Sequence, residues 1–251
     1  MAPKIFGWEH ILYIVISFAL TGVGLWLIKK YCKTEKSKKI AVYVTAGILL
    51  ASIVFNRVSI AALDSNPLGL VPTTTCGFTS LVFAILTLSI RNRNHSVFHF
   101  IIYLAFGAGL VSVIYCDFIG QASSIWYPKT ISGLLHHSVD VFLALLLYIL
   151  GEFRPSLKKW WCFIFGACAY VAIGLFFIQA FGFGGALWIN SPVLPGLYWY
   201  ILWPAYFAIV FIGVLIHEFV LKKIRLKQEK EPKPEIKPEK RVLLDKNSKK
   251  K

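Results

Sequence analysis

Charged residues are scarce in this sequence. Only 16% of its 251 residues are Asp, Glu, Lys or Arg, whereas 57% are apolar, and the mean hydropathy is +0.66. Soluble domains carry about 25% charged residues on average. The composition therefore excludes an ordinary soluble domain and indicates that lipid is the solvent.

Paired cysteines and repeated patterns are also lacking. None of the five cysteines stands in a CxxC or CxxH motif, which excludes a zinc knuckle and a thiol redox motif. Any chemically active cysteine must therefore act alone. The alternating ten-residue segments of a membrane β-barrel are absent, and so is the internal repeat of inverted-repeat transporters.

What the sequence does contain is a series of long apolar runs. A helix needs about 20 mostly apolar residues to cross the hydrocarbon layer of ~30 Å. Seven runs approach this length, at residues 10–28, 40–60, 71–90, 97–118, 130–150, 160–181 and 198–221. The first run ends at Lys29 and Lys30 without a cleavage site, so it predicts a membrane span and not a removed signal peptide.

These runs predict an all-α fold, a polytopic membrane bundle of seven transmembrane helices over residues 1–225. Residues 226–251 are rich in Lys, Glu and Pro, a composition typical of a disordered tail.

Basic residues predict the orientation of the bundle. Of the 27 Lys and Arg residues, 24 fall in the tail and in the loops that lie on the tail's side of the membrane. The opposite side carries only Lys4, Arg57 and Lys129. The positive-inside rule then places the N-terminus outside and the C-terminus in the cytoplasm of a multi-pass cell-membrane protein. The net charge of +15 is explained by topology, and no basic patch with interleaved aromatics points to nucleic acid as a partner.

Ionisable residues inside a span are costly, and one predicted span holds three. Asp140 follows His136 by four residues and His137 by three, so each pair shares a helical face. Such clusters are functional by default. A carboxylate beside an imidazole orients the ring and suits it to act as a general base. The alternative is a His–Asp pair that only ties two helices together through hydrogen bonds.

Cys76 is predicted to lie at the same depth as these histidines, where the third run begins. A thiol at a helix N-terminus and within reach of an imidazole is placed to become a nucleophile, although a lone cysteine can also be an inert packing residue. Thr74 and Thr75 precede it and offer hydroxyl groups to a developing oxyanion. Arg57, at the outer end of the second run, either binds a phosphate or carboxylate or extends to the interface.

Three segments of the chain resemble the YwaF-like integral membrane proteins of bacteria, a family to which the eukaryotic transmembrane protein 164 acyltransferase belongs. The segments are Pro67-Leu68 to Thr74-Thr75-Cys76, His136-His137 followed by Arg154-Pro155, and Ala186-Leu187-Trp188-Ile189-Asn190-Ser191-Pro192 with Trp203-Pro204-Ala205-Tyr206. The likeness covers nearly all of the chain before the tail. Two departures stand out: Thr74 occupies a place where the family often has histidine, and Ile189-Asn190 replaces an Asn-Tyr pair.

The resemblance implies an enzyme that moves an acyl chain from a phospholipid to a lysophospholipid through a cysteine thioester. Carried over by position, Cys76 is the nucleophile and His137, or else His136, is the base. Asp140 would orient the imidazole, and this scheme requires no metal and no organic cofactor. Arg57, Thr74, Thr75 and Asn190 are the residues that we expect to contact the substrate.

Two other functions remain compatible with the sequence. A non-enzymatic membrane binder, either a transporter component or a receptor, needs only a polar pocket and no contact between thiol and imidazole. A structural scaffold predicts that Asp140 and both histidines are fully paired.

Overall fold

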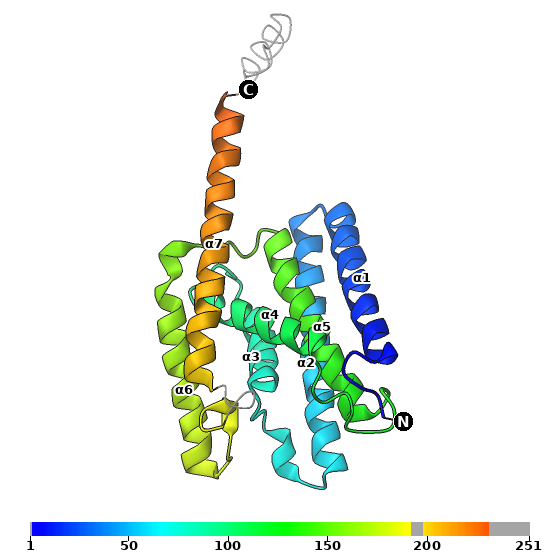
Figure 1. The fold of residues 1–251 in the computed structure, drawn as a ribbon. Helices are drawn as coiled ribbons and strands as arrows, with labels where there is room; N and C mark the ends of the chain where they lie inside the picture. Colours follow the sequence, from blue (N-terminus) through cyan, green and yellow to red (C-terminus); the bar gives the residue numbers. More distant parts are fainter. Residues whose placement is uncertain (1, 192–197, 231–251) are drawn as a thin grey trace, which may run out of the picture.

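The computed structural model describes residues 2–191 and 198–230, and in these ranges all regular secondary structure is helical and no β-strand occurs (Figure 1). The described chain forms α1 (Trp8–Tyr31), α2 (Glu35–Leu63), α3 (Thr75–Ser89), α4 (Phe98–Ile114), α5 (Pro128–Ile149), α6 (Trp161–Phe181) and α7 (Trp199–Lys230). Three short 3-10 helices, η1 (Pro67–Leu70), η2 (Leu157–Lys159) and η3 (Ala186–Trp188), lie in the connections. The predicted all-α fold with seven helices is confirmed.

Five of these helices, α1, α2, α5, α6 and α7, are long and apolar enough to cross a membrane. The other two are shorter than predicted: α3 has 15 residues and α4 has 17, about 22 and 26 Å at a rise of 1.5 Å per residue. The predicted run at 71–90 becomes helical only at Thr75, because Pro72 favours an extended residue before it and Thr74 then caps the helix. At the end of α4, Tyr115 already leaves the helical conformation.

The two short helices lie in the middle of the molecule. In Figure 1, α3 and α4 stand between the group formed by α1, α2 and α5 and the pair formed by α6 and α7. The helices α2, α3, α4 and α5 share the main core. Its side chains with no exposed surface include Leu49, Phe83, Phe98 and Leu146, one from each of these helices. The central position of α3 gives its first turn neighbours on α2 and α5, and these neighbours form the candidate site.

The helix α7 packs against α4 and α6 mainly through aromatic side chains. The ring of Trp203 lies 4.8 Å from that of Tyr170 and 5.9 Å from that of Phe100, measured between centroids. The hydroxyl of Tyr206 donates a hydrogen bond to the carbonyl oxygen of Tyr103.

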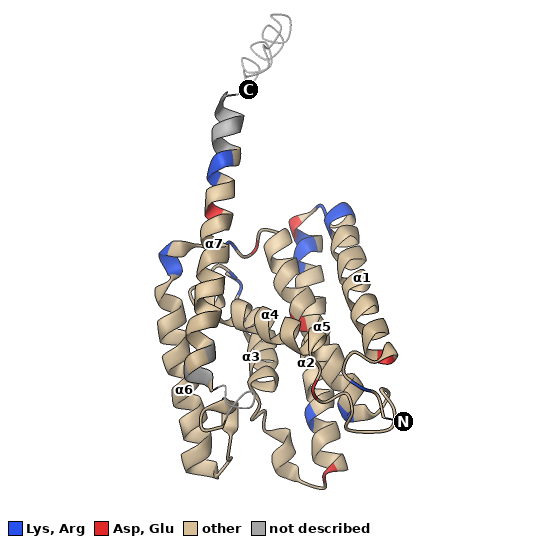
Figure 2. Cartoon of the chain, viewed as in Figure 1, with Lys and Arg blue, Asp and Glu red and all other residues tan. Residues whose placement is uncertain are grey.

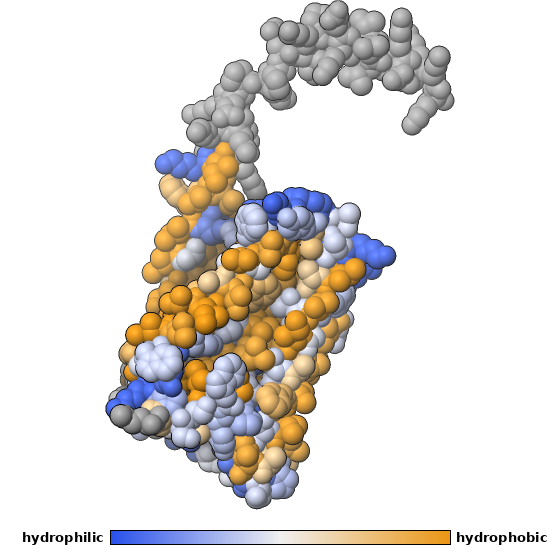
Figure 3. Space-filling view, turned by 90° about the vertical axis from the view of Figure 1, so that its right-hand side faces the viewer, coloured by the Kyte–Doolittle hydropathy of each residue, from blue (hydrophilic) through white to orange (hydrophobic). Residues whose placement is uncertain are grey.

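Charge is distributed unevenly along the bundle. Figure 2 shows most of the described Lys and Arg residues near the end of α1, the starts of α2 and α6 and the far part of α7. Apolar side chains cover most of the middle of the face seen in Figure 3. The N-terminal residues and the end of α7 lie at opposite ends of the bundle (Figure 1). Which end faces outward stays a prediction of the positive-inside rule.

The predicted boundary between bundle and tail is not a helix end. The helix α7 continues to Lys230, five residues beyond position 225. The remainder of the predicted tail, residues 231–251, lies outside the described residues, as does Pro192 of the third family-like segment.

Gly109 allows α4 to approach α5 beside the buried histidines. A Cβ atom at Gly109 would lie 2.9 Å from the His137 carbonyl oxygen and 3.1 Å from the Asp140 Cβ. We expect Gly109→Ala to destabilise the protein by about 1–3 kcal/mol, because the crowded atoms belong to a packed helix that cannot move aside freely. Thermal unfolding in detergent, followed by circular dichroism, measures this as a lower Tm.

Gly47 on α2 supplies the matched control, because a Cβ atom there would meet nothing within 4 Å. Gly47→Ala should leave Tm unchanged or raise it slightly, since alanine favours a helix by about 0.5–1 kcal/mol over glycine. Equal losses of Tm in the two variants would contradict the close packing of α4 on α5.

Candidate functional site

A cavity of about 270 Å³ lies between α2, α3 and α5 and contains most of the residues singled out in the sequence. We refer to it as the Cys76 cavity. Its lining comprises Asn56, Arg57, Ile60, Thr74, Cys76, Ser112, Asp117, Phe118, Gln121, Lys129, Gly133, His136, His137 and Trp188. The fold thus brings together a thiol, two imidazoles and a guanidinium from three helices.

The Cys76 cavity is set back from the end of the bundle. After α2 ends, the chain turns back along it, so that a Cβ atom at Gly69 would lie 3.0 Å from the backbone of Ala61. A Cβ atom at Gly77 would lie 3.6 Å from Cζ of Arg57, which places the first turn of α3 beside the guanidinium of Arg57. Arg57 precedes the end of α2 by six residues, or about 9 Å along the helix. In Figure 1 the connection that contains η1 accordingly extends beyond the start of α3.

The first turn of α3 presents free amide groups beside the thiol. The first four N–H groups of a helix have no acceptor within the helix. The Thr74 side chain accepts one of them, from Gly77, at 3.2 Å. No hydrogen bond to the amides of Thr75 and Cys76 is found in the described part of the chain. These amides and the positive end of the helix dipole favour negative charge next to the Cys76 sulfur.

The nearest polar partner of the thiol is a hydroxyl group. Cys76 Sγ lies 3.5 Å from Ser112 Oγ on α4. Among the described residues no hydrogen bond connects this thiol to either imidazole, although both rings line the same cavity.

The two histidines differ in how their nitrogens are engaged. His136 Nδ1 lies 2.9 Å from the carbonyl oxygen of Ser132, so this nitrogen carries the hydrogen and donates. His136 Nε2 then has the free lone pair, and it is buried without a hydrogen-bond partner in the described structure. The His137 ring packs against that of His136 in a tilted arrangement, with 4.1 Å between centroids and 40° between the ring planes, and it also packs against Phe118. His137 Nδ1 is likewise buried without a partner among the described residues, so His136 differs from it by a hydrogen bond that fixes its tautomer and leaves Nε2 as the acceptor.

Asp140 is fully buried but does not orient either ring. Its Oδ2 lies 2.5 Å from the hydroxyl oxygen of Ser80, on α3, while its Oδ1 has no partner among the described residues. Sequence spacing placed Asp140 on the face of the histidines, but its short side chain meets Ser80 before it can reach an imidazole one turn away. The carbonyl of Ser132 takes the orienting role that was predicted for Asp140.

Arg57 brings a positive charge to the cavity. One of its terminal nitrogens donates to Asn56 Oδ1 at 2.6 Å, and its Nε is buried without a partner in the described residues. Asn56 is held in turn by donating to Ser132 Oγ at 2.9 Å. The other cation of the lining, Lys129, pairs with Asp64 at 2.7 Å. No carboxylate pairs with Arg57 in the described part of the chain, so its charge is available to a ligand.

Comparison with known families gives a single clear result. The model of the TMEM164 family matches residues 5–216, which is most of the chain. The chain belongs to the TMEM164 family. No curated protein and no solved structure matches it significantly. Together with the long apolar helices, membership of the TMEM164 family identifies a multi-pass membrane protein. The matched range includes every residue of the Cys76 cavity.

In this TMEM164-family chain, two predicted substrate contacts lie outside the cavity. The Thr75 hydroxyl shares a hydrogen bond with the Tyr170 hydroxyl on α6. Asn190 is exposed, and its Oδ1 accepts from the Gly185 amide at 2.8 Å. Thr74 does line the cavity, but its hydroxyl oxygen caps α3. Thr75 and Asn190 therefore hold local structure in this conformation, and their contact with a substrate stays a prediction.

Several polar or aromatic cavity residues were not predicted as site residues from the sequence: Asn56, Ser112, Asp117, Phe118, Gln121 and Trp188. Asn56 carried a usable signal, because an amide directly before an arginine interrupts an apolar run. Trp188 reaches the cavity because the Leu187 amide donates to the carbonyl of Thr73 at 2.7 Å, which holds the loop before α7 against the start of α3. Nothing in the sequence indicates that contact.

Proposed function

We propose that this TMEM164-family protein is an integral membrane phospholipid acyltransferase, or a related lipid acyl hydrolase, that carries the acyl group on Cys76 as a thioester. One observation carries the proposal. The Cys76 cavity combines a thiol at a helix N-terminus with an imidazole, His136, whose Nε2 is free to accept a proton. The family-like segments around Cys76 and His136 support the same reaction.

In the first half-reaction, His136 Nε2 takes the proton of the thiol, and the sulfur attacks the ester carbonyl carbon of a phospholipid. Negative charge develops on the carbonyl oxygen, and the amides of Thr75 and Cys76 favour it. The carbon–oxygen bond of the ester then breaks. The leaving lysophospholipid oxygen takes the proton from the imidazolium, and the acyl group remains on sulfur.

In the second half-reaction, the hydroxyl of another lysophospholipid attacks the thioester carbon while His136 Nε2 accepts its proton. The sulfur leaves and regains a proton from the imidazolium, so the enzyme returns to its starting state. Water in place of the lysophospholipid would release a free fatty acid. Neither half-reaction requires a metal or an organic cofactor.

The position of the cavity suits a substrate that arrives from the bilayer. Its set-back depth lets the ester linkage meet Cys76 while the phosphate lies close to Arg57. With the predicted orientation, the N-terminus outside, the cavity would face the outer leaflet of the cell membrane.

Replacing Arg57 tests the phosphate contact. A hydrogen bond to a charged group contributes about 1.5–3 kcal/mol, so we expect Arg57→Gln to raise KM for the phospholipid roughly 10- to 100-fold. Arg57→Lys keeps the charge but loses the planar fork, and we expect it to recover only part of the effect. Initial rates over a range of donor concentrations in mixed micelles measure KM.

Lys129→Gln is the control for Arg57, because Lys129 lines the same cavity but is already paired with Asp64. It should change KM less than Arg57→Gln does. A larger effect of Lys129→Gln would contradict the assignment of the phosphate to Arg57.

The activity itself is tested with the purified protein in vesicles of phosphatidylcholine that carries a radiolabelled acyl chain, with lysophosphatidylethanolamine as acceptor. An acyltransferase produces labelled phosphatidylethanolamine, and a hydrolase produces labelled fatty acid. The contact between Cys76 and Ser112, in place of an imidazole, supports a non-enzymatic lipid binder as the second candidate. That candidate predicts stoichiometric lipid binding and neither labelled product.

A further inference from the structure

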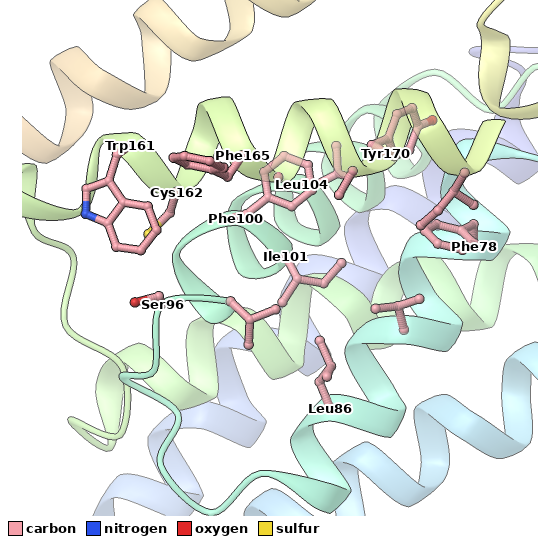
Figure 4. Close-up of a pocket in the computed structure, with 15 residues that line it drawn as sticks. Phe78, Leu86, Ser96, Phe100, Ile101, Leu104, Trp161, Cys162, Phe165 and Tyr170 are labelled. Carbon is pink, nitrogen blue, oxygen red and sulfur yellow. The ribbon is translucent and has the colours of Figure 1, made fainter. Parts of the chain in front are cut away.

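A second, larger hollow of about 410 Å³ runs between α3, α4 and α6 (Figure 4). We call it the α3–α4–α6 groove. Its wall on α3 consists of Phe78, Val82 and Leu86, which are spaced four residues apart and therefore share one face of the helix. Val97, Ile101 and Leu104 form the corresponding face of α4. The groove is thus lined along its length by apolar side chains.

The groove begins next to the proposed nucleophile. Phe78 stands two residues after Cys76 on α3, and Tyr170 lies with Phe78 at one end of the groove in Figure 4. The Tyr170 hydroxyl forms hydrogen bonds with the Thr75 side chain and with the carbonyl of Leu187. Tyr170 lines the groove and Thr75 directly precedes Cys76, so this contact links the end of the groove to the turn that carries the thiol.

From Phe78 the groove extends about 12 Å along α3, the rise of the eight residues to Leu86. Trp161, Cys162 and Ser96 lie at its far end (Figure 4). There the Lys159 ammonium donates to Ser96 Oγ at 3.0 Å. A polar contact therefore marks the end of the apolar channel.

Small residues line the α6 side of the groove. Gly166 lies against Phe100, because a Cβ atom at Gly166 would be 2.2 Å from Cγ of that ring. One turn along the helix, Ala169 contributes only a methyl group to the wall and is exposed toward the groove.

We propose that the α3–α4–α6 groove holds the acyl chain of the donor phospholipid while its carbonyl carbon lies at Cys76, and that the length of the groove selects the chain. This inference rests on the proposed acyltransferase function and names the part of the substrate that it selects. The chain would run along α3 from the Cys76 turn, and the Thr75–Tyr170 contact would open to admit it. Lipid tails are as apolar as the groove wall, so burial gives little affinity. The groove acts by shape, and it discriminates between chains of different length.

Two tryptophan variants of α6 test this inference. Ala169→Trp fills the groove, whereas Ala172→Trp, three residues further along, is equally exposed but does not line it. Each variant is reconstituted with phosphatidylcholine that carries a diazirine within its acyl chain. Cross-linked peptides are then mapped by mass spectrometry. Acyl transfer is measured in parallel with donors of 8 to 20 carbons, a series chosen to be shorter and longer than the groove.

We expect wild type and Ala172→Trp to cross-link at the groove faces of α3 and α6. Ala169→Trp should lose these cross-links at least tenfold and should prefer shorter donors than wild type does. If wild type transfers no chain, the proposed function fails, and the cross-links alone decide whether the groove holds an acyl chain. Transfer with an unchanged length profile in Ala169→Trp, or equal changes in both variants, would overturn the inference. An absence of cross-links on the groove peptides of wild type would overturn the inference as well.

Discussion

Replacing Cys76 with serine is expected to abolish formation of the acyl-enzyme and to reduce acyl transfer on the order of 10³-fold or more. Serine keeps the size of the side chain and the contact with Ser112, so packing is preserved while the nucleophilic sulfur is lost. A hydroxyl is a far weaker nucleophile than a thiol activated by the same base. Intact-protein mass spectrometry after incubation with phosphatidylcholine should show a hydroxylamine-sensitive acyl adduct on wild type and none on Cys76→Ser.

Cys116→Ser is the matched control for this experiment. Cys116 is fully buried next to the end of α4 and does not line the Cys76 cavity. The adduct should persist in this variant at the wild-type level. An adduct that survives Cys76→Ser and disappears in Cys116→Ser would move the reaction to another site.

His136→Gln is expected to slow acylation of Cys76 by about 10²- to 10⁴-fold, the usual contribution of a general base. Glutamine stays polar in the buried position but cannot accept and return a proton. His137→Gln should have a smaller effect, because the fixed tautomer and free Nε2 belong to His136. Single-turnover acylation rates, measured by rapid quench and mass spectrometry, separate the chemical step from lipid binding.

The two histidines make a sensitive comparison because they are adjacent and equally buried. The reverse order of effects would make His137 the base, which was the first choice from the resemblance. Equal and small effects in both variants would instead favour the non-enzymatic binder. The Tm of each variant must stay near that of wild type for any of these results to be interpreted.

The length of apolar runs predicted the long helices well and the short ones poorly. The helices α1 and α2 extend two to five residues beyond each predicted limit, because charged flanking residues such as Lys29 and Lys39 continue the helix. The runs at 71–90 and 97–118 include Val71, Tyr115 and Phe118, which are apolar or aromatic residues of loops. Hydropathy cannot separate such residues from a helix, because loops packed against a bundle are apolar as well. Pro72 and the cap at Thr74 were the only local signs that α3 begins late.

Depth along the helices was predictable for the candidate site, but side-chain direction was not. The positive-inside rule and helix counting placed Cys76, His136 and Arg57 at one level, and these residues share the Cys76 cavity. Neighbouring residues of a helix diverge by about 100°, which is why Cys76 faces the cavity and Thr75 faces Tyr170. Ser112 required knowledge of how α4 packs on α3, and pair spacing on α5 alone could not show that Ser80 competes for Asp140.

The late start of α3 ties the proposed chemistry to the thickness of the host membrane. The first turn of α3 meets the guanidinium of Arg57, a residue that lies about 9 Å before the end of α2 along that helix, whereas the ester groups of lipids lie near the boundary of the hydrocarbon layer. A thicker bilayer moves the lipid esters farther from Cys76, and a thinner one brings them closer. Each Å of hydrophobic mismatch between protein and bilayer costs fractions of a kcal/mol. The lipids that surround the protein, and not only those that it processes, would then regulate its rate.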